Sequence, residues 1–349
     1  MRKLARHRLF WPVTALIILM VINTIARPRF ASITVQDDRL YGALIDILRQ
    51  SAPLMLVSLG MTVVIATRGI DLSVGAVMAV SGAVALTIID NSADANSTTT
   101  VLVAVTVAVL ASLILGVWNG FLVSVLGIQP IIATLVLMLA GRGVALLITD
   151  GFITTVNSRP FAFISTGYLL LLPFAFFIWV AAVAVVALIE RRTALGVLTE
   201  AVGINPEASR LAGVRFRSII WGGYAATGLL SGIAGIIYAS NIRAADANAA
   251  GQFIELYAIL AVVLGGTSLM GGKFSIAGTV VGVLIIQTLE SSILFLGVPP
   301  AQSPVFFALV VVVVVVIQSP ALHRFVRRLG GPGRSRRISD PDVEVGATP

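Results

Sequence analysis

Residues 100–124 read TVLVAVTVAVLASLILGVWNGFLVS and contain no Asp, Glu, Lys or Arg. A helix needs about 20 apolar residues to cross the hydrocarbon core of a bilayer, so this stretch is long enough to span a membrane. The rest of the chain has the same character, because 58% of its 349 residues are hydrophobic and 11% are charged, against about 25% charged in soluble domains. We therefore expect an all-α, polytopic membrane protein. The composition excludes a soluble enzyme, a nucleic-acid-binding domain and a disordered chain.

Polar breaks separate ten apolar stretches, which we interpret as candidate transmembrane helices. We expect about ten spans, although eight would also fit the charge pattern described next. Stretch 254–265 is especially short, as is typical of broken helices or of helices that begin in interfacial segments. The candidates are residues 9–26, 48–67, 72–89, 100–124, 130–148, 167–189, 218–238, 254–265, 276–296 and 304–320.

The basic residues predict the orientation of the chain. Of its 24 Lys and Arg residues, 15 lie in three polar segments, 1–8, 190–217 and 321–349. Positively charged loops stay in the cytoplasm, which places both ends inside and requires an even number of spans. We therefore expect a cytoplasmic basic N-terminus (1–8), a transmembrane domain (9–320) with a cytoplasmic loop (190–217), and a disordered cytoplasmic tail (321–349).

Residue types that several kinds of catalysis require are missing from the sequence. It has no Cys, and its two His residues, His7 and His323, lie in the basic end segments. We therefore expect no disulfide, no metal site, no cofactor and no Ser–His catalysis within the membrane. Segment 265–273 is rich in glycine but lacks the spacing of a phosphate-binding loop, because Thr267 stands where Gly is needed and Phe274 follows Lys273. The chain is thus expected to have no ATPase site of its own.

A polar turn separates two of the apolar stretches. Residues 67–75 read TRGIDLSVG, and Asp71 and Ser73 stand where the next helix should begin, as N-cap residues do. Ionisable residues at membrane depth are costly and usually face an interior or an aqueous path. Pairing with Arg68 would reduce the cost of burying Asp71. Two interpretations stay open: a capped turn between helices, or a gate in a transport path.

Neutral hydrogen-bonding side chains form a second polar group, at Asn119, Gln129 and Thr134. Pro130 fits the start of the helix that carries Thr134. Side chains of this kind suit an uncharged, polyhydroxylated solute. The alternative is that they bond neighbouring helices to one another without any solute.

Arg142 stands between two glycines in an apolar stretch. Its charge requires a carboxylate such as Asp150, helix carbonyls or water, unless the side chain extends to the membrane interface. Arg142 completes our candidates for the lining or gate of a translocation pathway. These candidates are Asp71, Ser73, Asn119, Gln129, Thr134 and Arg142.

The cytoplasmic loop 190–217 contains a clear helix signal. Asn205 can cap a helix, Pro206 fits its first position and Glu207 favours the positive end of its dipole. Gly213 fits the residue that follows the end of such a helix. The pattern predicts a helix of about two turns outside the membrane, with a small apolar face that would fit a groove on a soluble partner. An ordinary solvated loop is the alternative. The apolar face consists of Ala208, Leu211 and Ala212.

Small residues at helical spacing predict close packing between helices within the chain. Three Gly-xxx-Gly pairs lie in the apolar stretches, and each lets two backbones approach. They are Gly116 with Gly120, Gly228 with Gly232, and Gly278 with Gly282.

Taken in order, these segments resemble the permease subunits of bacterial ABC sugar importers of the ribose, xylose and galactofuranose type. The resemblance covers about residues 40–320. The chain is most similar to the galactofuranose type. The residues that carry this similarity are Gln36-Asp37, Arg39-Leu40, residues 45–48 (IDIL) and residues 243–248 (RAADAN). The family usually has Gly where this chain has Arg68. The other matching segments are 69–75, 129–135 (QPIIATL), 141–143 (GRG), 203–213 (GINPEASRLAG) and 259–268 (ILAVVLGGTS).

The resemblance implies ten transmembrane helices in two five-helix halves of opposite orientation, in the inner membrane of a bacterium. It implies import of a monosaccharide, with galactofuranose or a related pentose or hexose as the expected cargo. It also implies a cytoplasmic ATP-binding-cassette ATPase, a periplasmic sugar-binding protein and a second permease subunit, either a copy of this chain or a sister chain. Membrane lipid is an expected partner and nucleic acid is not.

The resemblance also implies that residues 203–213 form the coupling helix that docks into the ATPase. The coupling candidates are Gly203, Asn205, Glu207, Ala208, Arg210 and Gly213.

Three other functions are compatible with a membrane protein of this composition. An ion-coupled secondary transporter of a small polar solute would use Asp71 and Arg142 and would need no ATPase. An intramembrane enzyme would need paired carboxylates, and the sequence contains no convincing pair. A structural scaffold would carry no solute.

Overall fold

The computed structural model describes residues 9–37 and 39–295, together with residues 305, 308 and 312. The chain divides into two units, Met1–Ser303 and Pro304–Pro349, and the elements below belong to the first of them. Three expectations fall outside the described residues: the N-terminus 1–8, the tail 321–349, and the candidate helix 304–320 apart from three of its residues.

Nearly all the regular structure is helical, which confirms the all-α class. The described residues form twelve α-helices and the short 3-10 helix η2, Pro28–Ala31. The α-helices are α1 Phe10–Ala26, α2 Ala43–Ala66, α3 Val74–Asp90, α4 Thr98–Ser124, α5 Pro130–Ile148, α6 Arg159–Thr166, α7 Phe174–Arg192, α8 Ala194–Ile204, α9 Pro206–Leu211, α10 Phe216–Ile242, α11 Ile254–Leu264 and α12 Ile276–Phe295.

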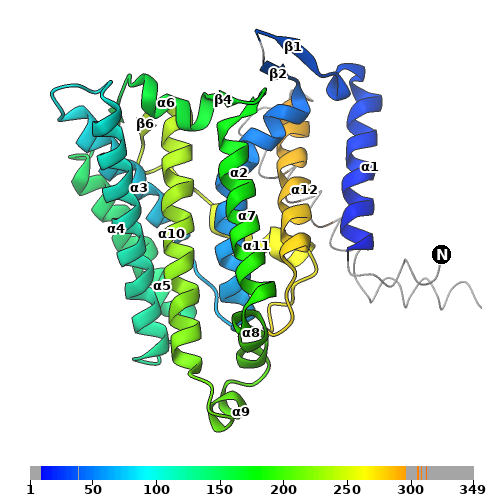
Figure 1. Cartoon of the computed structure of the whole chain (residues 1–349), viewed down its shortest axis with the longest axis vertical. Coiled ribbons are helices and arrows are strands. Elements are labelled where there is room, and N and C mark those ends of the chain that lie inside the picture. Colours follow the sequence, from blue (N-terminus) through cyan, green and yellow to red (C-terminus); the bar gives the residue numbers. More distant parts are fainter. Residues whose placement is uncertain (1–8, 38, 296–304, 306–307, 309–311, 313–349) are drawn as a thin grey trace, which may run out of the picture. The chain divides into compact units, whose positions relative to one another are not determined.

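Three small antiparallel strand pairs accompany the helices, and the sequence did not predict them. They lie at the end of the helical body that is opposite α9 (Figure 1). In the first pair Val35 lies opposite Leu40. The pairs are β1 Thr34–Gln36 with β2 Arg39–Tyr41, β3 Thr154–Thr155 with β6 Ala244–Ala245, and β4 Tyr168–Leu169 with β5 Leu172–Pro173.

Six helices within the described residues are long and apolar enough to cross a membrane: α2, α4, α5, α7, α10 and α12. Helices α1, α3, α8 and α11 are apolar but shorter. The outer face of α4 is apolar, since Leu102 and Ile114 are 62% and 66% exposed. Such faces suit lipid, in which helices can satisfy their own backbone polar groups. The chain is a multi-pass membrane protein, and the count of ten spans stays a prediction.

Most helix boundaries lie close to those expected from the sequence, and α5 begins and ends at the expected residues, Pro130 and Ile148. The prediction for 167–189 was wrong at its start, because α7 begins at Phe174. The residues before it form the β4–β5 hairpin, in which Leu170 and Leu171 have positive φ. Helix α6 was not predicted.

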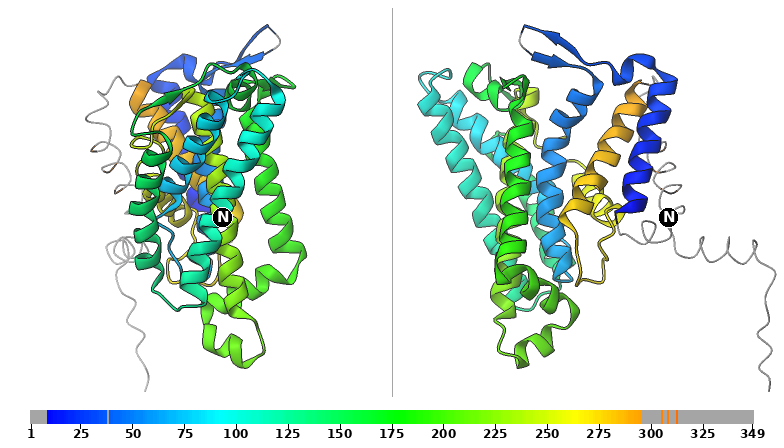
Figure 2. Two further views of the ribbon diagram at one scale, coloured as in Figure 1. Left: turned by 90° about the vertical axis from the view of Figure 1, so that its left-hand side faces the viewer. Right: turned by 45° about the vertical axis from the view of Figure 1, so that its right-hand side comes forward.

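Helix α10 is the central packing element of this unit. It lies against α4, α2 and α3, and α12 packs on α2 and α11 (Figures 1 and 2). Close glycine contacts make this arrangement possible, as predicted. A Cβ atom on Gly228 would lie 2.6 Å from the Cα atom of Gly116 and 2.6 Å from the carbonyl oxygen of Ser112. Gly282 likewise lies against the backbone of Ala261 in α11.

We expect Gly228→Ala to lower the free energy of unfolding by about 1–3 kcal/mol, because the added methyl group would push α10 away from α4. The matched control is Gly222→Ala in the same helix, where a Cβ atom would meet nothing within 4 Å. The measurement is the thermal unfolding midpoint of the two purified variants in detergent. Equal midpoints would contradict the close packing of α4 and α10.

Candidate functional site

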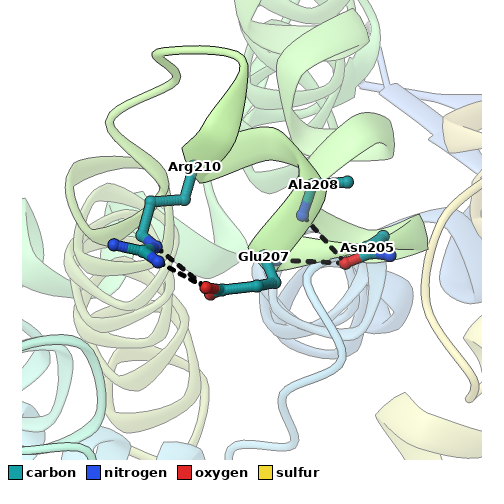
Figure 3. Close-up of polar contacts among 4 residues, drawn as sticks. All are labelled: Asn205, Glu207, Ala208 and Arg210. Atoms are coloured by element: carbon teal, nitrogen blue, oxygen red, sulfur yellow. Dashed lines mark hydrogen bonds and ion pairs between the residues drawn. The ribbon is translucent and has the colours of Figure 1, made fainter.

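The helix predicted in loop 190–217 is present as α9, which lies beyond the ends of α7 and α10 (Figure 1). The Asn205 side-chain oxygen accepts hydrogen bonds from the backbone N–H groups of Glu207 (3.1 Å) and Ala208 (3.0 Å), as Figure 3 shows. Gly213 follows the helix end with φ of 83°, a left-handed conformation that favours glycine. The predicted cap, helix and terminating glycine are therefore confirmed.

Helix α9 presents both an apolar and a charged surface to its surroundings. Leu211 is 79% exposed, and Ala208 is exposed as well. The Arg210 guanidinium donates to the Glu207 carboxylate over 2.5 Å and 3.1 Å, and both side chains are more than half exposed. The hydrogen bond from Arg210 and its positive charge lower the pKa of Glu207 below its usual value. Ser209 faces the other way, and its hydroxyl donates to the Asn205 carbonyl.

Helix α8 precedes α9 and was not predicted. It begins at a cap in which the Thr193 hydroxyl accepts from the Leu195 N–H over 3.2 Å. The apolar residues Leu195, Leu198 and Val202 follow at helical spacing, and this is the signal that could have revealed the helix. Gly196 is buried against the end of α7, where an added Cβ atom would collide with the Glu190 carbonyl oxygen.

Three segments meet where α8 ends. A Cβ atom on Gly203 would collide with the carbonyl oxygen of Ala66, the last residue of α2. The same carbonyl accepts a hydrogen bond from the Gly272 N–H over 2.9 Å. We call this meeting of Ala66, Gly203 and Gly272 the three-segment junction. Through it, the segment that carries α9 is bound to a membrane helix and to the chain between α11 and α12.

Arg68 binds the same junction through its side chain. Its guanidinium donates to the carbonyl of Ile204, the last residue of α8, where the negative end of the helix dipole favours a cation. The expected pairing of Arg68 with Asp71 was wrong, because the two side chains have other partners. Arg68 has φ of 65°, a left-handed conformation that glycine adopts without strain and an arginine does not.

Asp71, Ser73 and Asn119 form one buried hydrogen-bonded cluster. One Asp71 carboxylate oxygen accepts from the Ser73 N–H (2.9 Å) and hydroxyl (2.6 Å). The Asn119 amide of α4 donates to the Ser73 oxygen over 2.8 Å. Ser73 occupies the N-cap position of α3, but its side chain accepts no hydrogen bond from that helix. The cluster thus ties the start of α3 to α4, and its role in a pathway stays a prediction.

The remaining pathway candidates occupy different positions. The buried Thr134 hydroxyl donates to the carbonyl of Pro130 in its own helix (2.9 Å) and shares this bond with the Ile70 carbonyl in the polar turn (3.4 Å). Gln129 is exposed at the start of α5 and does not cap it with its side chain.

Arg142 lies on α5 and binds backbone carbonyls of the segment between β6 and α11. Its guanidinium donates to Ala247 and Ala250 over 2.7 Å each. Asp150 is therefore not its hydrogen-bond partner, and backbone carbonyls outside α5 solvate the charge instead. The result is a link between α5 and a non-helical segment.

A cavity of about 450 Å³ opens in the half of the helical body away from α9. It lies between α2, α10, α11 and α12, with the segment before α11 and one residue of α6 completing its wall. In the described part of the chain, none of the six pathway candidates lines it. Sequence analysis missed this cavity because its polar residues lie on helices far apart in the chain.

Known proteins resemble this chain over most of its length. Residues 43–315 match the family described as the branched-chain amino acid transport system / permease component. The chain belongs to this permease family. It is 46% identical to a galactofuranose transporter permease of Escherichia coli (strain K12), over 93% of this chain and 94% of that protein.

Two further relatives are similar to this chain over most of their length. A fructose import permease of Bifidobacterium longum (strain NCC 2705) is 43% identical over 92% of this chain and 90% of its own. A ribose import permease of Haemophilus influenzae is 37% identical over 86% of this chain and 90% of its own. No solved structure matches the permease.

Arg68 supplies a test of the junction. We expect Arg68→Ala to lower the thermal unfolding midpoint more than Arg68→Gly does, by the equivalent of about 1–2 kcal/mol. Both variants lose the bond to the Ile204 carbonyl, but only glycine adopts φ of 65° without strain. Hydrogen exchange of the amides in α8 should rise in both variants. Unchanged exchange would show that Arg68 does not hold the end of α8.

Proposed function

We propose that this chain is the membrane-spanning permease subunit of an ABC importer that carries a monosaccharide across the bacterial inner membrane. The observation that carries the proposal is helix α9, which is capped, exposed and held against the membrane helices at the three-segment junction. The names of the relatives support a sugar as cargo, with galactofuranose, fructose and ribose as the first sugars to test.

The proposal assigns the energy source to a separate subunit. ATP hydrolysis takes place in a cytoplasmic ATP-binding-cassette ATPase, and the permease conducts the sugar without catalysing a reaction. The segment Gly203–Gly213 is the coupling element. Leu211 and Ala208 enter an apolar groove of the ATPase, and the Glu207–Arg210 pair fixes the position of α9 through charged contacts. Membership of the permease family supports this division of labour.

The orientation of the chain follows from this assignment. The end that carries α9 faces the cytoplasm, as do residues 1–8 and 321–349, and 9–320 form the transmembrane domain. The end that carries the strand pairs faces the periplasm, where a sugar-binding protein delivers the cargo. A second permease subunit, a copy or a sister chain, completes the membrane part. The concentration of basic residues in 1–8, 190–217 and 321–349 supports this topology.

The coupling role is tested by exchanging the charges on α9. The double variant Glu207→Arg with Arg210→Glu keeps an ion pair within the helix but reverses the charges that a partner meets. We expect binding to the ATPase to weaken about tenfold or more and sugar uptake to fall to background, while the inserted amount stays normal. Uptake of radiolabelled sugar by cells with the complete transporter measures the effect.

A conservative double variant, Glu207→Asp with Arg210→Lys, is the matched control, because it keeps both charges in place. It should retain most of the uptake. Normal uptake by the charge-exchanged variant would remove the coupling role from α9. Sugar accumulation by the purified chain alone in liposomes, driven by an ion gradient, would instead identify an ion-coupled transporter.

A further inference from the structure

The cavity between α2, α10, α11 and α12 has the size and composition of a small-molecule site. Its volume of about 450 Å³ lies within the roughly 300–1,000 Å³ that such sites occupy. Charged and amide side chains reach it from four different parts of the fold. They are Arg49 and Gln50 of α2, Asn241 of α10, Gln252 before α11, and Gln287 and Glu290 of α12.

The position of these residues in the membrane domain indicates a function. Arg49, Asn241 and Glu290 lie on helices long and apolar enough to span a bilayer. Asn241 is the last but one residue of α10 and Arg49 lies in the second turn of α2, whereas Glu290 lies within the apolar span 276–293 of α12. A charged group inside such a span is expensive, and it usually marks the path of a solute. Glu290 is exposed even though α12 is otherwise largely buried, so its carboxylate faces open space in the cavity.

The polar groups are held in place by bonds to one another. The Arg49 guanidinium donates to the Asn241 side-chain oxygen over 3.2 Å, and it also lies 3.4 Å from the Asp46 carboxylate. The Gln287 amide donates to the Glu290 carboxylate over 3.2 Å. A guanidinium has five N–H donors, and an amide has two donors and an acceptor oxygen. Within the described residues, both pairs therefore keep capacity to bind further hydroxyl groups.

The chemistry of the lining favours an uncharged polyol over an ion. One arginine and one carboxylate contribute opposite charges, so the wall selects neither cations nor anions. The amides offer donors and acceptors side by side, as the hydroxyl groups of a sugar require. Tyr238 and Tyr257 add aromatic surface to the same wall, against which the C–H face of a sugar ring can pack.

We propose that this cavity is the site at which the permease binds its monosaccharide during translocation, through hydroxyl contacts to Asn241, Gln252, Gln287 and Glu290. This inference rests on the proposed function and names the binding site within it. The cavity lies on the side of the fold away from α9, so it receives the sugar from the periplasmic side. Its opening to the outside and its shared, partly satisfied polar groups allow the sugar to leave again.

The first experiment compares transport by alanine variants of amide residues in the complete transporter. Asn241→Ala and Gln287→Ala should raise the KM for uptake by about tenfold. Each variant removes a hydrogen bond to the sugar from a network that includes a charged side chain. They should also change the relative rates for galactofuranose, fructose and ribose, because different sugars place their hydroxyls differently. Asn91→Ala is the control, since Asn91 is exposed at the end of α3 and does not line the cavity.

The second experiment measures access to the cavity by chemical labelling, with uptake after labelling as a second readout. The chain has no native Cys, so single-Cys variants can be labelled cleanly. Gln252→Cys should react with a negatively charged, membrane-impermeant thiosulfonate added from the periplasmic side, and the bulky adduct should block uptake. Leu139→Cys on the outer face of α5 should react slowly and keep its uptake, because that side chain is exposed away from the cavity.

The outcomes separate this inference from the proposed function. Unchanged KM and sugar preference in both alanine variants would overturn the binding site while leaving the permease function intact. Slow labelling of Gln252→Cys, or full uptake after labelling, would overturn it as well. Absence of sugar uptake by the unmodified, complete transporter would instead contradict the proposed function itself.

Discussion

The bilayer offers no water to bond a free backbone group, and this constraint organises the whole fold. Two segments in the helical body are not helical, residues 67–73 before α3 and residues 243–253 before α11. Side chains satisfy their backbone groups: Asp71 accepts from the Ser73 N–H, and Arg142 donates to the carbonyls of Ala247 and Ala250. Several polar residues at membrane depth therefore have a structural reason to be present without any solute. Such supported breaks are typical of transporters, because irregular backbone at membrane depth must be buried in protein or line a cavity.

Close backbone contacts decide how the helices around these breaks are arranged. Gly75, at the start of α3, lies so near the chain before α11 that a Cβ atom would collide with the Gly251 carbonyl oxygen. Gly116 and Gly228 allow the same approach between α4 and α10. Lipid removes most of the hydrophobic drive for helix association, so dispersion contacts between such surfaces carry the packing. Glycine thus lets the two non-helical segments lie close together. The hydrogen bonds that satisfy their backbone groups are therefore short-range.

Local patterns in the sequence were enough to predict the apolar helices and α9. Pro130 marked the start of α5, and the run Asn205-Pro206-Glu207 marked the start of α9, because capping depends only on neighbouring residues. Partners far apart in the chain were not predictable. Arg68 was expected to meet Asp71 three residues away, yet it bonds Ile204, which is 136 residues away. The cavity combines α2, α10 and α12, and no spacing rule connects them. Short strand pairs such as β3–β6 escaped detection for the same reason.

Two helices connect the cytoplasmic end of the proposed transporter to the cavity. Helix α2 carries Ala66 at the three-segment junction and Arg49 in the cavity wall, and α10 begins just after α9 and carries Asn241 in the same wall. A hydrogen-bonded helix transmits displacement along its axis with little deformation, whereas a loop would absorb it. In the proposed mechanism, a force applied to α9 acts on the bond between Arg49 and Asn241, which joins these two helices across the cavity. The ATPase can change the affinity for sugar only if its own two states place α2 and α10 differently, because a ligand shifts an equilibrium only through differential binding. Under the proposed function, the close contact of Gly203 with Ala66 and the bond from Arg68 to Ile204 meet this requirement, because they hold the end of α8 against α2 without a flexible linker.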